Sequence, residues 1–312
     1  MKKCRIGGQA VIEGVMMKNY DKYAVAVRKP DDTIDVKVND YVPVGEKVKL
    51  FKLPFIRGIF NFIESLVVGF KTLTYSASFY EEEEEETVVD KAVSKIFKDK
   101  AEDFVTFVTV ILSIAIAIGL FMLLPAFLVQ LLEKVITSRM LRSVIEGIIR
   151  LLIFIIYVAL ISMLEDIKRT FMYHGAEHKT INCLEAGDDL TPENVLKHSR
   201  YHKRCGTSFL FVVMMVSIVV FMFINTDSTL MRMVYRVLLV PVVASISYEF
   251  IMLAGRNDSE VVNILSKPGL WVQRLTTKEP DLKMAEVAIA SVEAVLDWRA
   301  YLDAMRKGEL ED

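Results

Sequence analysis

Long apolar segments alternate with polar ones through the middle of this chain. Four of them, residues 104–132, 145–164, 209–225 and 234–254, reach or approach the roughly 20 apolar residues that a helix needs to cross a bilayer. This pattern predicts a mainly α-helical, polytopic membrane protein with about four transmembrane helices, grouped in residues 104–254.

The first fifty residues follow a different pattern. Residues 23–29 and 33–38 are rich in strand-forming side chains, and Pro30, Asp31 and Asp32 between them favour a turn. We therefore predict a small β-rich element at the N-terminus, residues 1–50, which is too small to be stable alone.

Residues 51–103 are predicted to hold interfacial or amphipathic helices. Arg57, Glu64 and Lys71 recur at seven-residue spacing in an otherwise apolar stretch, so they share one stripe of a helix. Such a stripe favours a helix that lies at the membrane interface or packs on the bundle, and we favour the interfacial position.

Two further polar segments flank the predicted spans. The six consecutive glutamates at 81–86 indicate a solvated linker, and residues 88–100 are predicted to form a short amphipathic helix. After the last span, residues 255–312 are predicted to form a cytoplasmic tail, which is rich in loops up to 280 and ends in an amphipathic helix at 282–306.

Composition agrees with a membrane protein and excludes other classes. Hydrophobic residues make up 53% of the chain, and the mean hydropathy is +0.37. The net charge is −2 and no basic tract is present, so nucleic acid is not an expected partner. The three cysteines, an odd number, do not form a disulfide framework.

Charge bias predicts the orientation of the spans. Residues 165–208 carry seven Lys and Arg residues, and further lysines precede the first span, whereas the loops at the other end carry few. Both termini and the 165–208 segment are therefore predicted to be cytoplasmic. The reducing cytosol would keep Cys183 and Cys205 as free thiols.

All four histidines lie in this segment, as two His-x-x-x-His pairs: His174 with His178, and His198 with His202. Residues four apart share one helix face, from which two imidazoles can reach one metal ion. The first pair also has the His-x-x-Glu-His spacing of inverted zincins, in which the histidines hold zinc and the glutamate, here Glu177, polarises water.

Cys205 adds a soft ligand three residues after the second pair. The candidate metal ligands are therefore His174, His178, His198, His202 and Cys205, and Glu177 is the candidate catalytic base. The alternative interpretation is that these histidines face the solvent or the lipid headgroups.

The local sequence also predicts how these pairs meet. No proline interrupts residues 145–190, so the second span is predicted to continue into the cytosol as one helix. Thr191, Pro192 and Glu193 are typical of a helix start, and the new helix is predicted to reach Arg204. Two antiparallel helices would then place the histidine pairs face to face beside the membrane, and Thr207 or Ser208 would cap the next span.

Several ionisable residues in apolar surroundings have two interpretations each. Glu13 is either a solvent-facing strand residue or a carboxylate of the metal site. Glu146 and Arg150, four apart, are predicted to pair with each other near the interface. Glu249 either extends to the interface or, like Asp188, supplies a further carboxylate ligand.

Four motifs resemble one known family. They are GGQAVIEGVMM at 7–17, YHGAEHKT at 173–180, HxxCGTSF at 202–209 and QRLTTKEP at 273–280. Together they are similar to the DUF1385 family of bacterial membrane proteins, which has no assigned function and whose members are commonly labelled metal-dependent enzymes. The resemblance covers nearly the whole chain and implies a location in the bacterial inner (cytoplasmic) membrane.

The leading functional hypothesis is a metal-dependent membrane enzyme, a hydrolase that uses zinc or another divalent ion. Its substrate at the cytoplasmic membrane face would be lipid-linked or a membrane peptide. The alternative is a non-enzymatic scaffold or assembly factor with a structural metal clip made by His174, His178, His202 and Cys205. Iron fits less well, because di-iron enzymes of the histidine-box type need about twice as many histidines. A transporter is disfavoured by the absence of broken helices and inverted repeats from the pattern.

Overall fold

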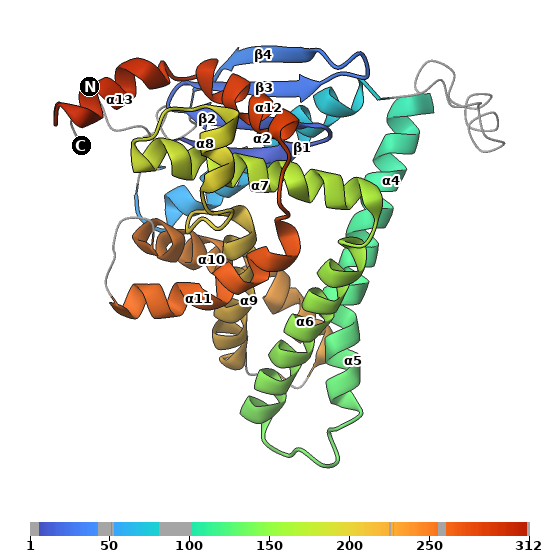
Figure 1. The fold of residues 1–312 in the computed structure, drawn as a ribbon. Coiled ribbons are helices and arrows are strands. Elements are labelled where there is room, and N and C mark those ends of the chain that lie inside the picture. The colour runs from blue at the N-terminus through green and yellow to red at the C-terminus, as the bar shows by residue number, and fades with distance from the viewer. Residues whose placement is uncertain are drawn as a thin grey trace.

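The computed structural model describes residues 6–42, 51, 53–80, 101–224, 226, 228–254 and 260–310. The acidic run at 81–86 and the short helix predicted at 88–100 lie outside these residues. Within them the chain is mostly helical, with one small antiparallel sheet near the N-terminus (Figure 1). The predicted fold class is confirmed to that extent.

The helices follow one another along the chain from α2 to α13. They are α2 (Ile56–Ala77), α4 (Ala101–Ile118), the π-helix η3 (Gly119–Leu123), α5 (Leu124–Gln130), α6 (Arg139–Ile161), α7 (Glu165–Ala186), α8 (Pro192–Lys197), α9 (Gly206–Met222), α10 (Thr229–Ala254), α11 (Glu260–Thr276), α12 (Leu282–Glu293) and α13 (Trp298–Arg306).

The N-terminal sheet contains β1 (Gly7–Val11), β2 (Gly14–Asn19), β3 (Lys22–Arg28) and β4 (Ile34–Asp40), antiparallel and in chain order. The predicted hairpin between β3 and β4 is confirmed, with Arg28 opposite Ile34. The glycine-rich motif at the start of the chain forms a second hairpin, β1–β2, in which Val11 pairs with Gly14.

Both faces of the central strands β2 and β3 are buried. Alternate side chains such as Val15 and Met17 belong to the main core, which α7 and α12 complete. The intervening side chains, such as Val11 and Val25, form a second cluster with apolar residues of α2. Helices from three distant parts of the sequence, α2, α7 and α12, therefore pack on the sheet and stabilise it.

Three of the four expected spans are found as candidate spans, and the fourth expected span is a shorter helix. Within the described residues, three helices are long and apolar enough to cross a membrane: Phe107–Gln130, Met140–Ile161 and Met231–Ala254. The fourth expected span corresponds to α9, an apolar helix of 17 residues that packs against α6, α10 and α11 (Figure 1).

The predicted helix at 55–79 forms as α2. It packs against α10 and the sheet and leaves apolar side chains such as Leu66 and Phe70 exposed. Arg57 at its start forms an ion pair with Glu249 of α10, in which Nε donates to Oε1 at 2.7 Å. The two helices are therefore joined by a charged contact as well as by packing.

The helix predicted to run from 145 to 190 is broken. It ends at Ile161, and after three residues the chain turns into α7, which lies across the sheet (Figure 1). Glu165 and Asp166 occupy the first turn of α7, where carboxylates stabilise a helix N-terminus. These two carboxylates are a sequence signal for the start of a new helix, whereas the absence of proline alone favours one continuous helix.

The C-terminal segment also differs from the predicted tail. The part expected to be rich in loops contains α11, with Pro268 inside the helix. The helix predicted at 282–306 is divided into α12 and α13. Met284, Val287 and Ala288 of α12 are fully buried against the sheet and α7, so this segment completes the main core.

Gly175 on α7 provides a test of this packing. A Cβ atom there would lie 2.0 Å from the carbonyl oxygen of Lys278, so Gly175→Ala should force two backbones apart and lower the free energy of unfolding by about 1–3 kcal/mol or more. Gly119→Ala is the matched control, because a Cβ there meets no atom within 4 Å. Thermal unfolding of the detergent-purified variants measures both effects, and equal melting temperatures would contradict the close contact.

Candidate metal centre

The centre of α7 is a polar segment buried on all sides. Residues 175–181, about two helical turns, are all buried, and they include Glu177, His178 and Lys179. Charged and imidazole side chains are rarely buried unless they are paired or functional. The burial therefore marks this part of α7 as the candidate site.

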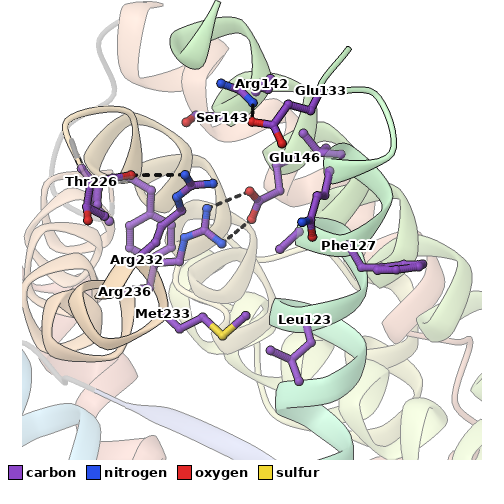
Figure 2. A pocket seen from close by; sticks show the side chains of 15 residues that line it. Leu123, Phe127, Glu133, Arg142, Ser143, Glu146, Thr226, Arg232, Met233 and Arg236 are labelled. Atoms are coloured by element: carbon purple, nitrogen blue, oxygen red, sulfur yellow. Dashed lines mark hydrogen bonds and ion pairs between the residues drawn. The ribbon is translucent and has the colours of Figure 1, made fainter. Parts of the chain in front are cut away.

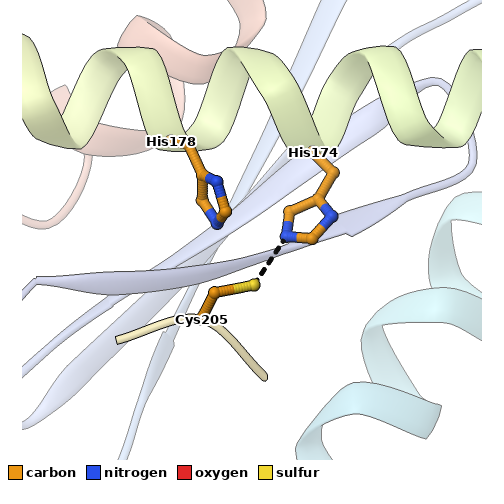
Figure 3. A group of neighbouring side chains, drawn as sticks. All are labelled: His174, His178 and Cys205. Carbon is orange, nitrogen blue, oxygen red and sulfur yellow. Dashed lines mark hydrogen bonds between the residues drawn. The ribbon is translucent and has the colours of Figure 1, made fainter. Parts of the chain in front are cut away.

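Three side chains converge there. His174 and His178 point from α7 toward Cys205, which lies just before α9 (Figure 3). The Nε2 of His174 is 3.3 Å from Sγ of Cys205, and one possible ligand atom from each of the three residues lies within 4.8 Å of the others. Two imidazoles and one thiolate are ligands that zinc prefers.

Both histidines are oriented by backbone carbonyl groups. The Nδ1 of His174 is 2.8 Å from the carbonyl oxygen of Thr276, and the Nδ1 of His178 is 2.6 Å from that of Arg200. If each Nδ1–H donates to its carbonyl, each Nε2 keeps a free lone pair, as in metal-binding histidines generally. Burial lowers the pKa of His178, which favours the neutral imidazole that a metal requires.

Cys205 is held at the N-terminus of α9. It is the N-cap residue, and the backbone N–H of Thr207 donates to its sulfur at 3.3 Å. A thiolate at this position faces the positive end of the helix dipole. The expected cap at Thr207 or Ser208 is therefore replaced by the cysteine itself.

Glu177 lies next to this cluster. Its Oε2 is 3.9 Å from Nε2 of His174, the nitrogen that faces Cys205. Burial raises the pKa of Glu177 to about 7, while the neighbouring His174 and a hydrogen bond from the backbone N–H of Gly8 act in the opposite direction. A carboxyl group with such a pKa can both accept and donate a proton near neutral pH.

His198 and His202 lie outside the three-residue cluster. The Nε2 of His198 is 2.9 Å from Asp188, and the Nε2 of His202 is 3.5 Å from Glu185. The two pairs do not face each other as predicted, because α8 ends at Lys197 and the chain up to Cys205 is irregular. His202 remains close, with its ring centroid 5.7 Å from that of His178.

The other candidate carboxylates have partners elsewhere. Asp188 pairs with His198, and Glu249 with Arg57. Glu13, at the turn between β1 and β2, forms an ion pair with Arg169 and accepts a hydrogen bond of 3.2 Å from the hydroxyl of Tyr173. It therefore anchors the sheet to α7 close to the site.

Cys183 also lies outside the three-residue cluster. Its Sγ lies 3.8 Å from the carbonyl oxygen of Asp188, and burial raises the pKa of its thiol to about 11. A neutral, buried thiol is typical of a packing residue.

Four residues that support the site were not recognised in the sequence. Gln273 accepts from the backbone N–H of His202 and donates to its carbonyl, at 3.0 and 2.8 Å, which fixes the segment before Cys205. Thr276 and Arg200 provide the carbonyl groups that orient the histidines. Gly8 permits close approach, because a Cβ there would lie 2.9 Å from Cγ of Glu177. The glycine-rich motif at 7–17 favours a tight turn or close backbone approach, which Gly8 shows, but neither this motif nor QRLTTKEP indicates its partner in the fold.

The geometry predicts which residues determine metal content. Single alanine substitutions of His174, His178 or Cys205 should remove most of the bound divalent ion from purified protein, because each removes one of three ligands. His198→Ala is the matched control and should retain the ion, since this imidazole pairs with Asp188. Elemental analysis measures the ion per chain. Equal loss in the control, or no ion in wild type even after titration, would contradict the site.

Comparison with known proteins agrees with the motifs. The chain is 36% identical over 310 residues to the uncharacterised protein YqhQ of Bacillus subtilis (strain 168), an alignment that covers 96% of this chain and 95% of YqhQ. No solved structure is significantly similar to it. Residues 53–298 match the family described as a protein of unknown function, DUF1385. The chain therefore belongs to the DUF1385 family.

Proposed function

We propose that this protein is a metal-dependent membrane enzyme, a hydrolase that acts at the cytoplasmic face of the bacterial inner membrane. His174, His178 and Cys205 would hold one divalent ion. The observation that carries the proposal is the combination of three converging ligand groups with a buried carboxyl group, Glu177, beside them.

The number of ligands supports a catalytic site over a closed one. Structural zinc sites use four protein ligands, whereas catalytic sites use three and leave one position for water or substrate. Within the part of the chain that the structure describes, three His, Cys, Asp or Glu side chains form the group. With His174, His178 and Cys205 as ligands, a tetrahedral ion would keep one coordination position for water or substrate.

The ligand types favour zinc. Imidazole nitrogen and thiolate sulfur suit zinc, whereas magnesium and calcium prefer oxygen ligands. Iron is the less suitable alternative, because the second histidine pair that a di-iron site would use is separated, with His198 on Asp188 and His202 near Glu185. Such an ion would act as a Lewis acid and lower the pKa of water at the open position.

Glu177 is proposed as the general base. It sits one residue before His178 on the buried segment of α7, with its Oε2 3.9 Å from Nε2 of His174, so its carboxylate lies beside the proposed ligands, where it would take a proton from water and return it to a leaving group. Glu177 and His178 are only 5% and 1% exposed, and charge interactions are stronger for buried groups than in water. The carboxyl group would thus hold the proton while the peptide or ester bond is cleaved.

The site's place in the fold suggests the kind of substrate. Cys205 immediately precedes the apolar helix α9, and α7 follows the candidate span in α6 after a three-residue break. A lipid-linked compound or a membrane peptide could therefore reach the site from the bilayer surface. The seven Lys and Arg residues of the 165–208 segment support a cytoplasmic position for this surface and for both termini.

A structural metal clip is the second candidate. The cluster joins α7 to the start of α9, and Thr276 at the end of α11 orients one histidine, so an ion there would connect three separate segments. The clip expected from the sequence has His202 as its fourth ligand, but His202 lies outside the cluster, with its Nε2 3.5 Å from Glu185. Glu177 would take that position instead, and the protein would be a scaffold or assembly factor. The distance of 3.9 Å from Glu177 to His174 is compatible with either role.

Glu177→Gln separates the two. If Glu177 is the base, the variant should retain its ion but lose hydrolysis of membrane peptides or lipid-linked esters by about 100-fold or more. Glu165→Gln is the matched control on the same helix, because that carboxylate is exposed and should affect neither property. Both the ion content and the hydrolysis rate are measured in proteoliposomes. Loss of the ion from Glu177→Gln would favour the clip and contradict the enzyme.

A further inference from the structure

A second polar site lies at the other end of the helix bundle. A cavity of about 360 Å³ is enclosed by the ends of α5 and α9 and the beginnings of α6 and α10 (Figure 2). The helix α6 begins at this cavity and ends beside α7, so the cavity and the candidate metal centre are separated by the length of a membrane span. The cavity is therefore independent of the proposed hydrolytic function.

Buried charges line one side of the cavity. Glu146 and Arg236 are only 4% and 3% exposed, although each lies five or six residues inside a candidate span, about 8–9 Å from its end. Arg236 donates to both oxygens of Glu146 at 2.6 and 2.7 Å, and Arg150 donates to the same carboxylate at 3.0 Å. The predicted Glu146–Arg150 pair is confirmed, but the structure adds a second guanidinium to it.

Positive charge is in excess around the cavity. A further pair, Arg142 with Glu133, is balanced. Arg232 points into the same space, and within the described residues its one hydrogen bond runs to the carbonyl oxygen of Thr226 at 3.3 Å (Figure 2). Within the described residues, three arginines and two glutamates line the cavity, and Arg150, which does not line it, shares Glu146 with Arg236. This group of described residues therefore carries an excess of two positive charges.

One donor also lacks an acceptor. The Nε of Arg236 is buried and has no hydrogen-bond partner among the described residues. A buried N–H group without an acceptor costs about 1–3 kcal/mol, and more when the group is charged. This Nε has no accessible surface toward the cavity, so it is the excess of positive charge among the lining residues and their partners that indicates a site for an anion.

We propose that this cavity binds a phosphate group. Arg232 and Arg236 are four residues apart on α10 and both line the cavity, so both charges act on an anion bound there. Arg236 is held by Glu146, whereas the planar guanidinium group of Arg232 is outside that cluster and can donate to oxygens of a tetrahedral anion. A phosphate monoester carries about −1.5 to −2 charges, which matches the excess. The apolar side chains of Leu123 and Phe127, 41% and 57% exposed, continue from the cavity to the outer surface of the bundle and suit an attached acyl chain. The phosphate could thus come from a lipid headgroup or from solution.

Equilibrium binding to delipidated, detergent-purified full-length protein tests the proposal. The probes are inorganic phosphate, a short-chain phosphatidic acid, and diacylglycerol of the same chain length. Wild type should bind one phosphate-bearing probe per chain and should not bind diacylglycerol. Preference for phosphatidic acid over inorganic phosphate would identify a lipid source, and equal affinity a soluble one. Failure of both phosphate probes to bind, or equal binding of diacylglycerol, would overturn the proposal.

Arg232→Gln should weaken phosphate binding at least tenfold. Its melting temperature without ligand should stay close to that of wild type, because Arg232 is not part of the Glu146 ion-pair cluster. Arg299→Gln, an exposed arginine of α13, is the control and should bind as wild type does. Arg232→Lys keeps the charge but not the planar fork and should show a smaller loss, which provides a second variant if the first does not fold. Wild-type affinity in both Arg232 variants would refute the role of this residue.

Discussion

Burial of a polar helical segment is the constraint on which the rest of the structure depends. Residues 175–181 of α7 are buried, and they carry a carboxyl group, an imidazole and an ammonium group. Each of these needs a partner to offset its desolvation. The sheet provides the N–H of Gly8, the segment before α9 provides the carbonyl of Arg200, and the Nζ of Lys179 donates to the carbonyl oxygens of Leu196 and His198, both at 2.9 Å. These contacts bring the separate parts of the chain together around one site.

The same contacts explain why the membrane helices and the N- and C-terminal segments form one body. Gly175 touches the backbone of the segment after α11, and α12 then completes the core of the N-terminal sheet. The site thus lies where the apolar helices meet a compact polar domain. Buried charge also needs partners at the beginning of α6, beside the arginine-rich cavity. There one carboxylate, that of Glu146, pairs with two guanidinium groups, those of Arg150 and Arg236. We infer that one polar site is completed by a metal ion and the other by an anion.

The sequence predicted what local pattern determines. Apolar length identified the three candidate spans, strand propensity the hairpin at β3–β4, and four-residue spacing the His174–His178 pair. It did not predict features that depend on long-range contacts. The helix predicted to reach Arg204 ends at Lys197 as α8. Lys179 of α7 binds the carbonyl oxygens of Leu196 and His198 there, and His198 and His202 lie outside the cluster. The burial of α12 and the supporting role of Gln273 likewise arise from segments far apart in the chain.

X-ray absorption spectroscopy at the edge of the bound ion, on full-length protein loaded with zinc, would test the metal centre most directly. The geometry predicts one sulfur at about 2.3 Å and two imidazole nitrogens at about 2.0–2.1 Å, with one lighter atom in the remaining position. Replacement of Cys205 by serine should remove the sulfur contribution alone. A first coordination sphere of oxygen atoms only, or one without sulfur in the wild-type protein, would contradict a site made by His174, His178 and Cys205.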